Sequence, residues 1–75
     1  MSEITFEIVR QIGVLFEKRN GWKKEVNLVS WNGGDPKIDI REWDETHTKM
    51  SRGLTFTQDE VMNLVNLLQT EIYRH

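Results

Sequence analysis

The chain has 75 residues, no cysteine and a formal net charge of −2. This length predicts one domain spanning residues 1–75, and the lack of cysteine excludes disulfide bonds and thiolate metal sites. The two histidines, His47 and His75, do not have a metal-ligand spacing, so we expect no metal and no other cofactor. A domain this small buries a modest share of its surface, which favours self-association as a source of further burial.

The sequence predicts no membrane association. The N-terminal stretch lacks the basic start and long apolar run of a signal peptide. The longest strongly apolar stretch, residues 12–16, is far too short to span a bilayer. Together with the lack of cysteine, these features favour a cytoplasmic location.

The first strand is predicted over residues 3–18, where apolar side chains recur at even positions: Ile4, Phe6, Ile8, Ile12, Val14 and Phe16. This is long for one strand, so a bend or bulge is expected between Arg10 and Gly13. Asn20-Gly21 is a strong hairpin signal. The second strand, residues 22–31, is therefore expected to pair antiparallel with the first.

The third strand is predicted over residues 37–43, after a turn-rich loop at 32–36, and the fourth over about residues 49–56. Thr57 and Glu60 then form a capping box that starts a helix. Apolar residues of this helix share one arc: Val61, Leu64, Val65, Leu68 and Ile72. The order predicts an α+β fold, a four-stranded antiparallel sheet with one face covered by the C-terminal helix.

The other sheet face is where function is expected. Alternation along the strands places Trp31, Trp43 and Arg41 together on this open face, whereas Trp22 has the opposite parity. An exposed aromatic patch indicates contact with another molecule. Aromatic side chains stack on unpaired bases while basic groups follow the phosphates, so the mixture favours single-stranded nucleic acid.

Two other interpretations of these residues stay open. The two tryptophans could pack across a dimer interface, and the basic residues could form an ordinary solvated face balanced by Glu25 and Asp39. Catalysis is not expected, because Asp39 and Glu42 lie on opposite faces of one strand and the chain shows no nucleophile–base pair or phosphate-binding glycine loop. We therefore expect no enzyme activity and no small-molecule substrate.

The net negative charge argues against a strongly basic binding surface, but the charge is unevenly distributed. Residues 17–52 carry eight of the ten basic residues together with seven acids, while residues 53–75 carry one basic residue and three acids. Phosphate binding depends on the local field, so the middle of the chain is where it is expected.

Two sequence runs carry a family resemblance. Ile38-Asp39-Ile40-Arg41-Glu42-Trp43, and then Met50-Ser51-Arg52-Gly53-Leu54-Thr55-Phe56 before the capped helix, resemble the transcriptional positive cofactor four family. More narrowly, the chain resembles the short bacterial, YdbC-like members of this family, over about residues 5–70. The resemblance implies a curved four-stranded sheet, a homodimer formed partly through the helix, and binding of single-stranded DNA with little sequence preference.

The resemblance also suggests roles for individual residues. Arg41 matches a basic DNA-contacting residue, Arg52 a basic residue at the start of the last strand, and Trp31 a base-stacking aromatic. Trp43 falls in the aromatic position after the Arg-Glu pair. Strand parity and the bacterial resemblance add four lysines, of which Lys24 has even parity: Lys23, Lys24, Lys37 and Lys49.

The sequence thus predicts a single-stranded DNA-binding homodimer, with RNA as an alternative ligand, acting in transcription regulation as a coactivator-like protein or in DNA maintenance. The alternative is a protein-interaction dimer that uses the tryptophan-bearing face.

Overall fold

The computed structural model describes residues 4–74, so Glu3 of the predicted first strand and His75 lie outside the described residues. The elements are β1 (Phe6–Glu17), β2 (Lys23–Trp31), β3 (Lys37–Trp43), β4 (Leu54–Phe56) and α1 (Gln58–Ile72). The strands form one antiparallel sheet in the order β1-β2-β3-β4. The predicted α+β class and strand order are confirmed.

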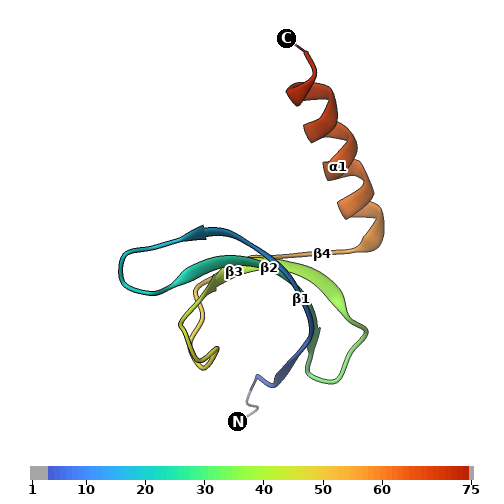
Figure 1. Cartoon of the computed structure of the whole chain (residues 1–75). Helices are drawn as coiled ribbons and strands as arrows, with labels where there is room; N and C mark the ends of the chain where they lie inside the picture. The colour runs from blue at the N-terminus through green and yellow to red at the C-terminus, as the bar shows by residue number, and fades with distance from the viewer. Residues whose placement is uncertain (1–3, 75) are drawn as a thin grey trace.

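The sheet is bent into an arch, and β1 shows why (Figure 1). Its pairing with β2 shifts between Ile8 and Arg10, between Gln11 and Gly13, and between Val14 and Phe16. A bulge adds an unpaired residue to one strand and increases local bending and twist. The predicted bend between Arg10 and Gly13 is therefore confirmed, and further irregularities lie on both sides of it.

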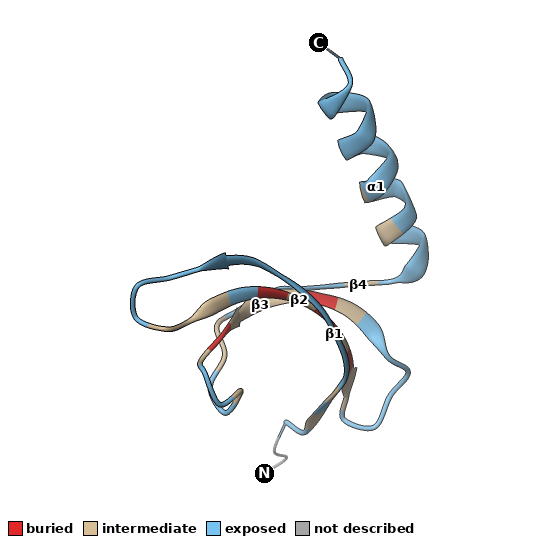
Figure 2. Cartoon of the chain, viewed as in Figure 1, coloured by how far each residue is buried: buried red, intermediate tan, exposed pale blue. Residues whose placement is uncertain are grey.

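The buried residues lie on the concave face of this arch. Val29, Trp43 and Asp39 are fully buried, and Asn27 and Glu25 nearly so. All are odd-numbered residues of β2 and β3, whose register places them on one face (Figure 2). The concave face is thus the interior of the single chain and not an open surface.

Two segments cover this face. The ring centroids of Phe6 and Trp43 are 5.1 Å apart, and those of His47 and Trp43 are 5.6 Å apart. Phe6 comes from the start of β1 and His47 from the loop between β3 and β4. Segments far from one another in sequence therefore complete the small core.

The expectation that the helix covers the even-numbered sheet face is wrong for the single chain. Helix α1 stands on the convex side and projects away from the sheet, and none of its residues is buried (Figures 1 and 2). The reason is local. The helix begins directly after the three-residue β4, and Thr57 between them is extended, so the chain runs outward from the sheet edge.

The helix start itself is as predicted. The Thr57 hydroxyl accepts a hydrogen bond from the Glu60 amide at 3.2 Å, and the Glu60 carboxylate accepts one from the Thr57 amide at 2.8 Å. This is the capping box expected from the sequence. Within residues 4–74, no helix is long and apolar enough to cross a membrane.

The fourth strand is shorter than predicted. Residues 49–53 do not join the ladder, apart from a single bridge between Met50 and Trp43. Gly53 passes so close to β3 that a Cβ there would collide with the Arg41 side chain and the Ile40 carbonyl. Glycine at this position lets the segment before β4 lie directly against Arg41.

Candidate nucleic-acid interface

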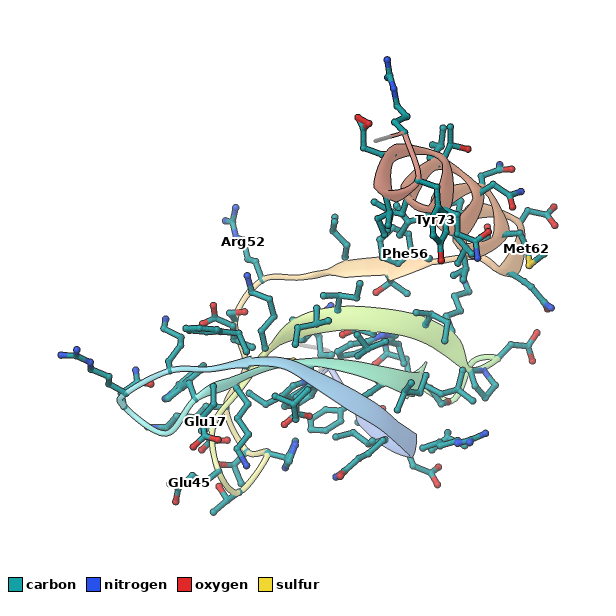
Figure 3. All side chains as sticks on the ribbon, turned by 45° about the horizontal axis from the view of Figure 1, so that its top comes forward. Glu17, Glu45, Arg52, Phe56, Met62 and Tyr73 are labelled. Carbon is teal, nitrogen blue, oxygen red and sulfur yellow. The ribbon has the colours of Figure 1, made fainter. Side chains whose placement is uncertain are left out.

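The strand register brings together five of the eight predicted binding residues on the concave face: Lys23, Trp31, Lys37, Arg41 and Trp43. The other three lie elsewhere. Lys24 is on the convex face, directly opposite Glu42. Arg52 points to the side on which the helix stands, away from Glu17 and Glu45 (Figure 3). Lys49 is exposed in the loop after His47.

Trp31 lies at the end of β2 and is half-buried. Its ring is 5.9 Å from that of Phe6, at an interplanar angle of 50°. The Arg41 guanidinium carbon lies over the indole, 4.5 Å from the ring centroid, within the range of a cation–π contact. Lys37, exposed on the neighbouring strand, pairs with Val29 two residues before Trp31.

The N-terminal segment is tied to this end of the sheet. The Thr5 amide donates to Asn32 Oδ1 at 2.9 Å, and the Asn32 amide donates to the Thr5 carbonyl at 2.8 Å. Asn32 adopts a left-handed backbone with a φ of 52°, which asparagine tolerates better than most residues. These bonds hold Phe6 against the aromatic rings of Trp31 and Trp43.

Trp43 lies on the predicted face but not in the predicted environment. Its side chain is fully buried between Phe6 and His47, whereas the sequence pattern placed it on an open surface. The physical reason is the return of the 44–49 loop beneath the arch. In this conformation the Trp43 ring is not accessible to a base.

A buried ion pair lies beside Trp31. Arg41 Nε is 2.6 Å from Asp39 Oδ1, and Arg41 Nη2 is 2.8 Å from Asp39 Oδ2. The Thr55 hydroxyl of β4 also donates to Asp39 Oδ2 at 2.8 Å. Asp39 is fully buried, and the Arg41 side chain is only 13% exposed. The bidentate pair lies within β3, and the Thr55 hydroxyl links it to the edge strand β4.

A second polar cluster closes the far end of the concave face. His47 Nε2 lies 2.9 and 3.0 Å from the two carboxylate oxygens of Glu25, and Asn27 Nδ2 donates to Glu25 Oε1 at 3.0 Å. The sequence suggested only a loop residue at His47. Nothing local could reveal the contact, because 22 residues separate His47 from Glu25 and the φ of His47 is +59°.

Phe6 is the aromatic residue that sequence reasoning missed at this site. Its even parity matches the rest of the first-strand pattern, yet the register pairs it with Trp31 on the concave face. The bulges in β1 shift its pairing with β2, so the residue number of Phe6 alone does not show which sheet face it lies on. Among residues 4–74, no group of three histidine, aspartate or glutamate side chains is arranged to hold a metal ion.

Asp44 organises the loop that carries His47. Its carboxylate accepts from the amides of Lys49 and Thr48 and from the hydroxyls of Thr46 and Thr48. The Lys49 amide is the largest cause that lowers the pKa of Asp44 from its ordinary 3.8 to about 2. The charged carboxylate is therefore part of the loop structure.

This gives a prediction about pH. The pKa of Asp44 is lower in the folded chain than in the unfolded chain, so the unfolded chain binds more protons as the pH falls. The contribution of Asp44 to the free energy of unfolding is therefore present above about pH 4 and is lost as the pH falls towards about 2. Asp44→Asn should lower the urea midpoint, measured by circular dichroism, at about pH 6 and make little difference near about pH 2. A difference that is constant across this range would contradict the role of the charge.

Comparison with known proteins identifies the family. A family model described as "Transcriptional Coactivator p15 (PC4)" matches residues 18–67, from the end of the first hairpin strand into α1. An uncharacterized protein of Treponema pallidum (strain Nichols) is 40% identical over 69 residues, covering 92% of this chain and 81% of the relative. The family match includes Trp31, Arg41 and Trp43, and it confirms the resemblance found in the sequence. The chain belongs to the transcriptional coactivator p15 (PC4) family.

Proposed function

We propose that this protein binds single-stranded DNA through the rim of its concave sheet face, as a homodimer, in a coactivator-like role in transcription or in DNA maintenance. The family is one of DNA-binding coactivators, which supports the ligand class. The observation that carries the proposal is Trp31, a half-buried indole near the exposed Lys37 at one end of the arch. RNA remains the alternative ligand, and the proposed location is the cytoplasm.

The proposed mechanism combines stacking with phosphate neutralisation. A base stacks against Trp31, a contact that any base can make, so little sequence preference is expected. Lys37 and Lys23 lie on the same face and are proposed to hold phosphates along the strand. Lys24, Lys49 and Arg52 lie outside that face and are proposed as peripheral phosphate contacts. Trp43 is proposed to support Phe6 and, through it, the stacking surface.

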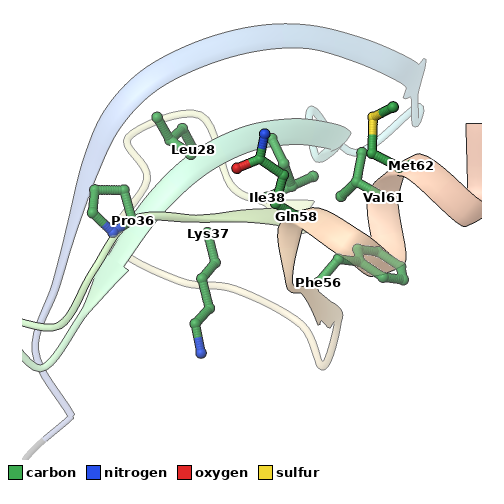
Figure 4. Close-up of a pocket in the computed structure, with 8 residues that line it drawn as sticks. All are labelled: Leu28, Pro36, Lys37, Ile38, Phe56, Gln58, Val61 and Met62. Atoms are coloured by element: carbon green, nitrogen blue, oxygen red, sulfur yellow. The ribbon is translucent and has the colours of Figure 1, made fainter.

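The homodimer is proposed because much of the apolar surface has no partner within one described chain. On α1, Val65, Leu68 and Ile72 are 42%, 52% and 66% exposed. A groove of about 310 Å³ lies between the convex sheet and the first turns of α1, lined by Leu28, Pro36, Lys37, Ile38, Phe56, Gln58, Val61 and Met62. The Lys37 side chain itself points away from the other lining residues (Figure 4). Exposed apolar patches of this kind mark interfaces. A second copy covering them would supply the burial that the helix lacks.

The test is a titration of fluorescein-labelled oligo-dT followed by anisotropy, at about 50 and about 200 mM salt. We expect binding that weakens at higher salt. Trp31→Ala should weaken it by about 5- to 140-fold, since stacking on one aromatic residue is worth about 1–3 kcal/mol. Lys37→Met should reduce the slope of log K against log salt by about 0.7.

The control variant is Trp22→Phe, which changes a tryptophan that precedes β2 and lies outside the proposed face. It should keep the wild-type affinity. No binding of oligo-dT by the wild type at low salt would reject the proposal and would leave the alternative, a protein-interaction dimer, as the better account of the exposed apolar surface.

A further inference from the structure

We infer that Arg41 is a positioning residue for Trp31 and not a phosphate contact: its charge is compensated by Asp39, and its guanidinium plane holds the indole ring in place for stacking. This inference rests on the proposed function, since it assigns the role of one residue in the same site. It differs from the role that the family resemblance implies for Arg41.

The guanidinium of Arg41 is already occupied by protein acceptors. Nε and Nη2 donate to the two oxygens of Asp39, and Nη1 lies 3.4 Å from the Ser51 carbonyl and 3.5 Å from the Met50 sulfur. An arginine has five N–H donors, so most of them are already directed at protein atoms. With the side chain 13% exposed, little of the fork is left to meet a phosphate.

The positive charge of Arg41 is compensated within the protein. Asp39 is fully buried next to the guanidinium, so the pair presents almost no net charge to a strand lying on the rim. Lys37, in contrast, is exposed and forms no salt bridge with the described residues. The salt-dependent part of binding is therefore expected from the lysines, because counterion release follows the phosphates that are neutralised.

Arg41 lies directly over the indole ring of Trp31. The guanidinium carbon lies 4.5 Å from the centroid of Trp31, and planar guanidinium groups stack on aromatic faces. Asp39 fixes the orientation of Arg41 by a bidentate contact, and Gly53 lets the 50–53 segment close over its side chain. The protein thus supports Trp31 through Arg41 and Phe6, and the ring keeps the partial exposure that the proposed stacking needs.

The test uses the double variant Asp39→Asn/Arg41→Met, because Arg41→Met alone would leave an unpaired buried carboxylate. In the free protein, acrylamide should quench tryptophan fluorescence more strongly in the double variant than in the wild type. The difference should vanish when both carry Trp31→Phe. With oligo-dT, the double variant should bind about 2- to 30-fold more weakly, the range of a cation–π contact, with an unchanged salt slope. Circular dichroism at the assay temperature verifies that the variant is folded.

The outcomes separate the two ideas. If the wild type binds oligo-dT and the double variant has a slope of log K against log salt reduced by about 0.7, Arg41 contacts a phosphate. That result would overturn this inference and leave the proposed function standing. Unchanged quenching would also overturn it, because Trp31 would then not depend on Arg41. A wild type that does not bind oligo-dT would overturn the proposed function, and with it any role of Arg41 in positioning for a base.

Discussion

Asp39→Ala is expected to lower the free energy of unfolding by about 3–5 kcal/mol, the usual cost of removing one partner of a buried ion pair. Asp39 is fully buried and accepts from Arg41 and Thr55, so its loss leaves a cation and a hydroxyl without their acceptor. A domain is stable by only about 5–15 kcal/mol in total, so the effect is large. Urea unfolding followed by circular dichroism measures it.

The double variant Asp39→Ala/Arg41→Met provides the control. It removes both charges, so no unpaired ion remains in the sheet, and its stability should lie closer to the wild type than that of Asp39→Ala. If the free energy of unfolding of the single variant lies within about 0.5 kcal/mol of the wild-type value, as for a surface substitution, the buried ion pair does not contribute to stability in this way.

Leu68→Glu is expected to convert the proposed dimer into monomers. Leu68 is 52% exposed in the single chain and lies in the middle of the apolar arc of α1. If a second copy covers this arc, a glutamate there would bury a carboxylate without a partner, at a cost that a small interface cannot offset. Sedimentation equilibrium at micromolar concentration measures the mass directly.

The matched control is Asn66→Glu, which adds the same charge to the opposite side of the helix. The Asn66→Glu variant should still sediment with the mass of a dimer. A Leu68→Glu variant that still sediments as a dimer would show that the two copies, if they associate, do so through another surface.

Local signals predicted the elements well. Residues 37–43 were bounded correctly because apolar alternation starts directly after Pro36, and the helix start was correct because the capping box is a contact between residues three apart. Parity also placed Trp31 and Arg41 on one face, since the register of β2 with β3 has no irregularity.

The parts that were not predicted depend on contacts between distant residues. The burial of Trp43 requires Phe6 and the 44–49 loop. Phe6 cannot be assigned to the concave face without the β1 bulges, and the loop is held there by the contact of His47 with Glu25, 22 residues away. The predicted placement of α1 was wrong, because an apolar arc indicates that one side of a helix is buried but does not indicate which surface buries it. Within residues 4–74, no residue of α1 is buried against the sheet.

The bulges of β1 have a consequence for association. β1 is an edge strand of twelve residues. A long and regular edge strand can pair with a strand from another molecule, which extends the sheet. Its three register shifts interrupt the even spacing of the outward amide and carbonyl groups that such an incoming strand would need. Growth into fibrils by edge addition is therefore disfavoured on this side, although the sheet carries exposed apolar residues such as Phe16.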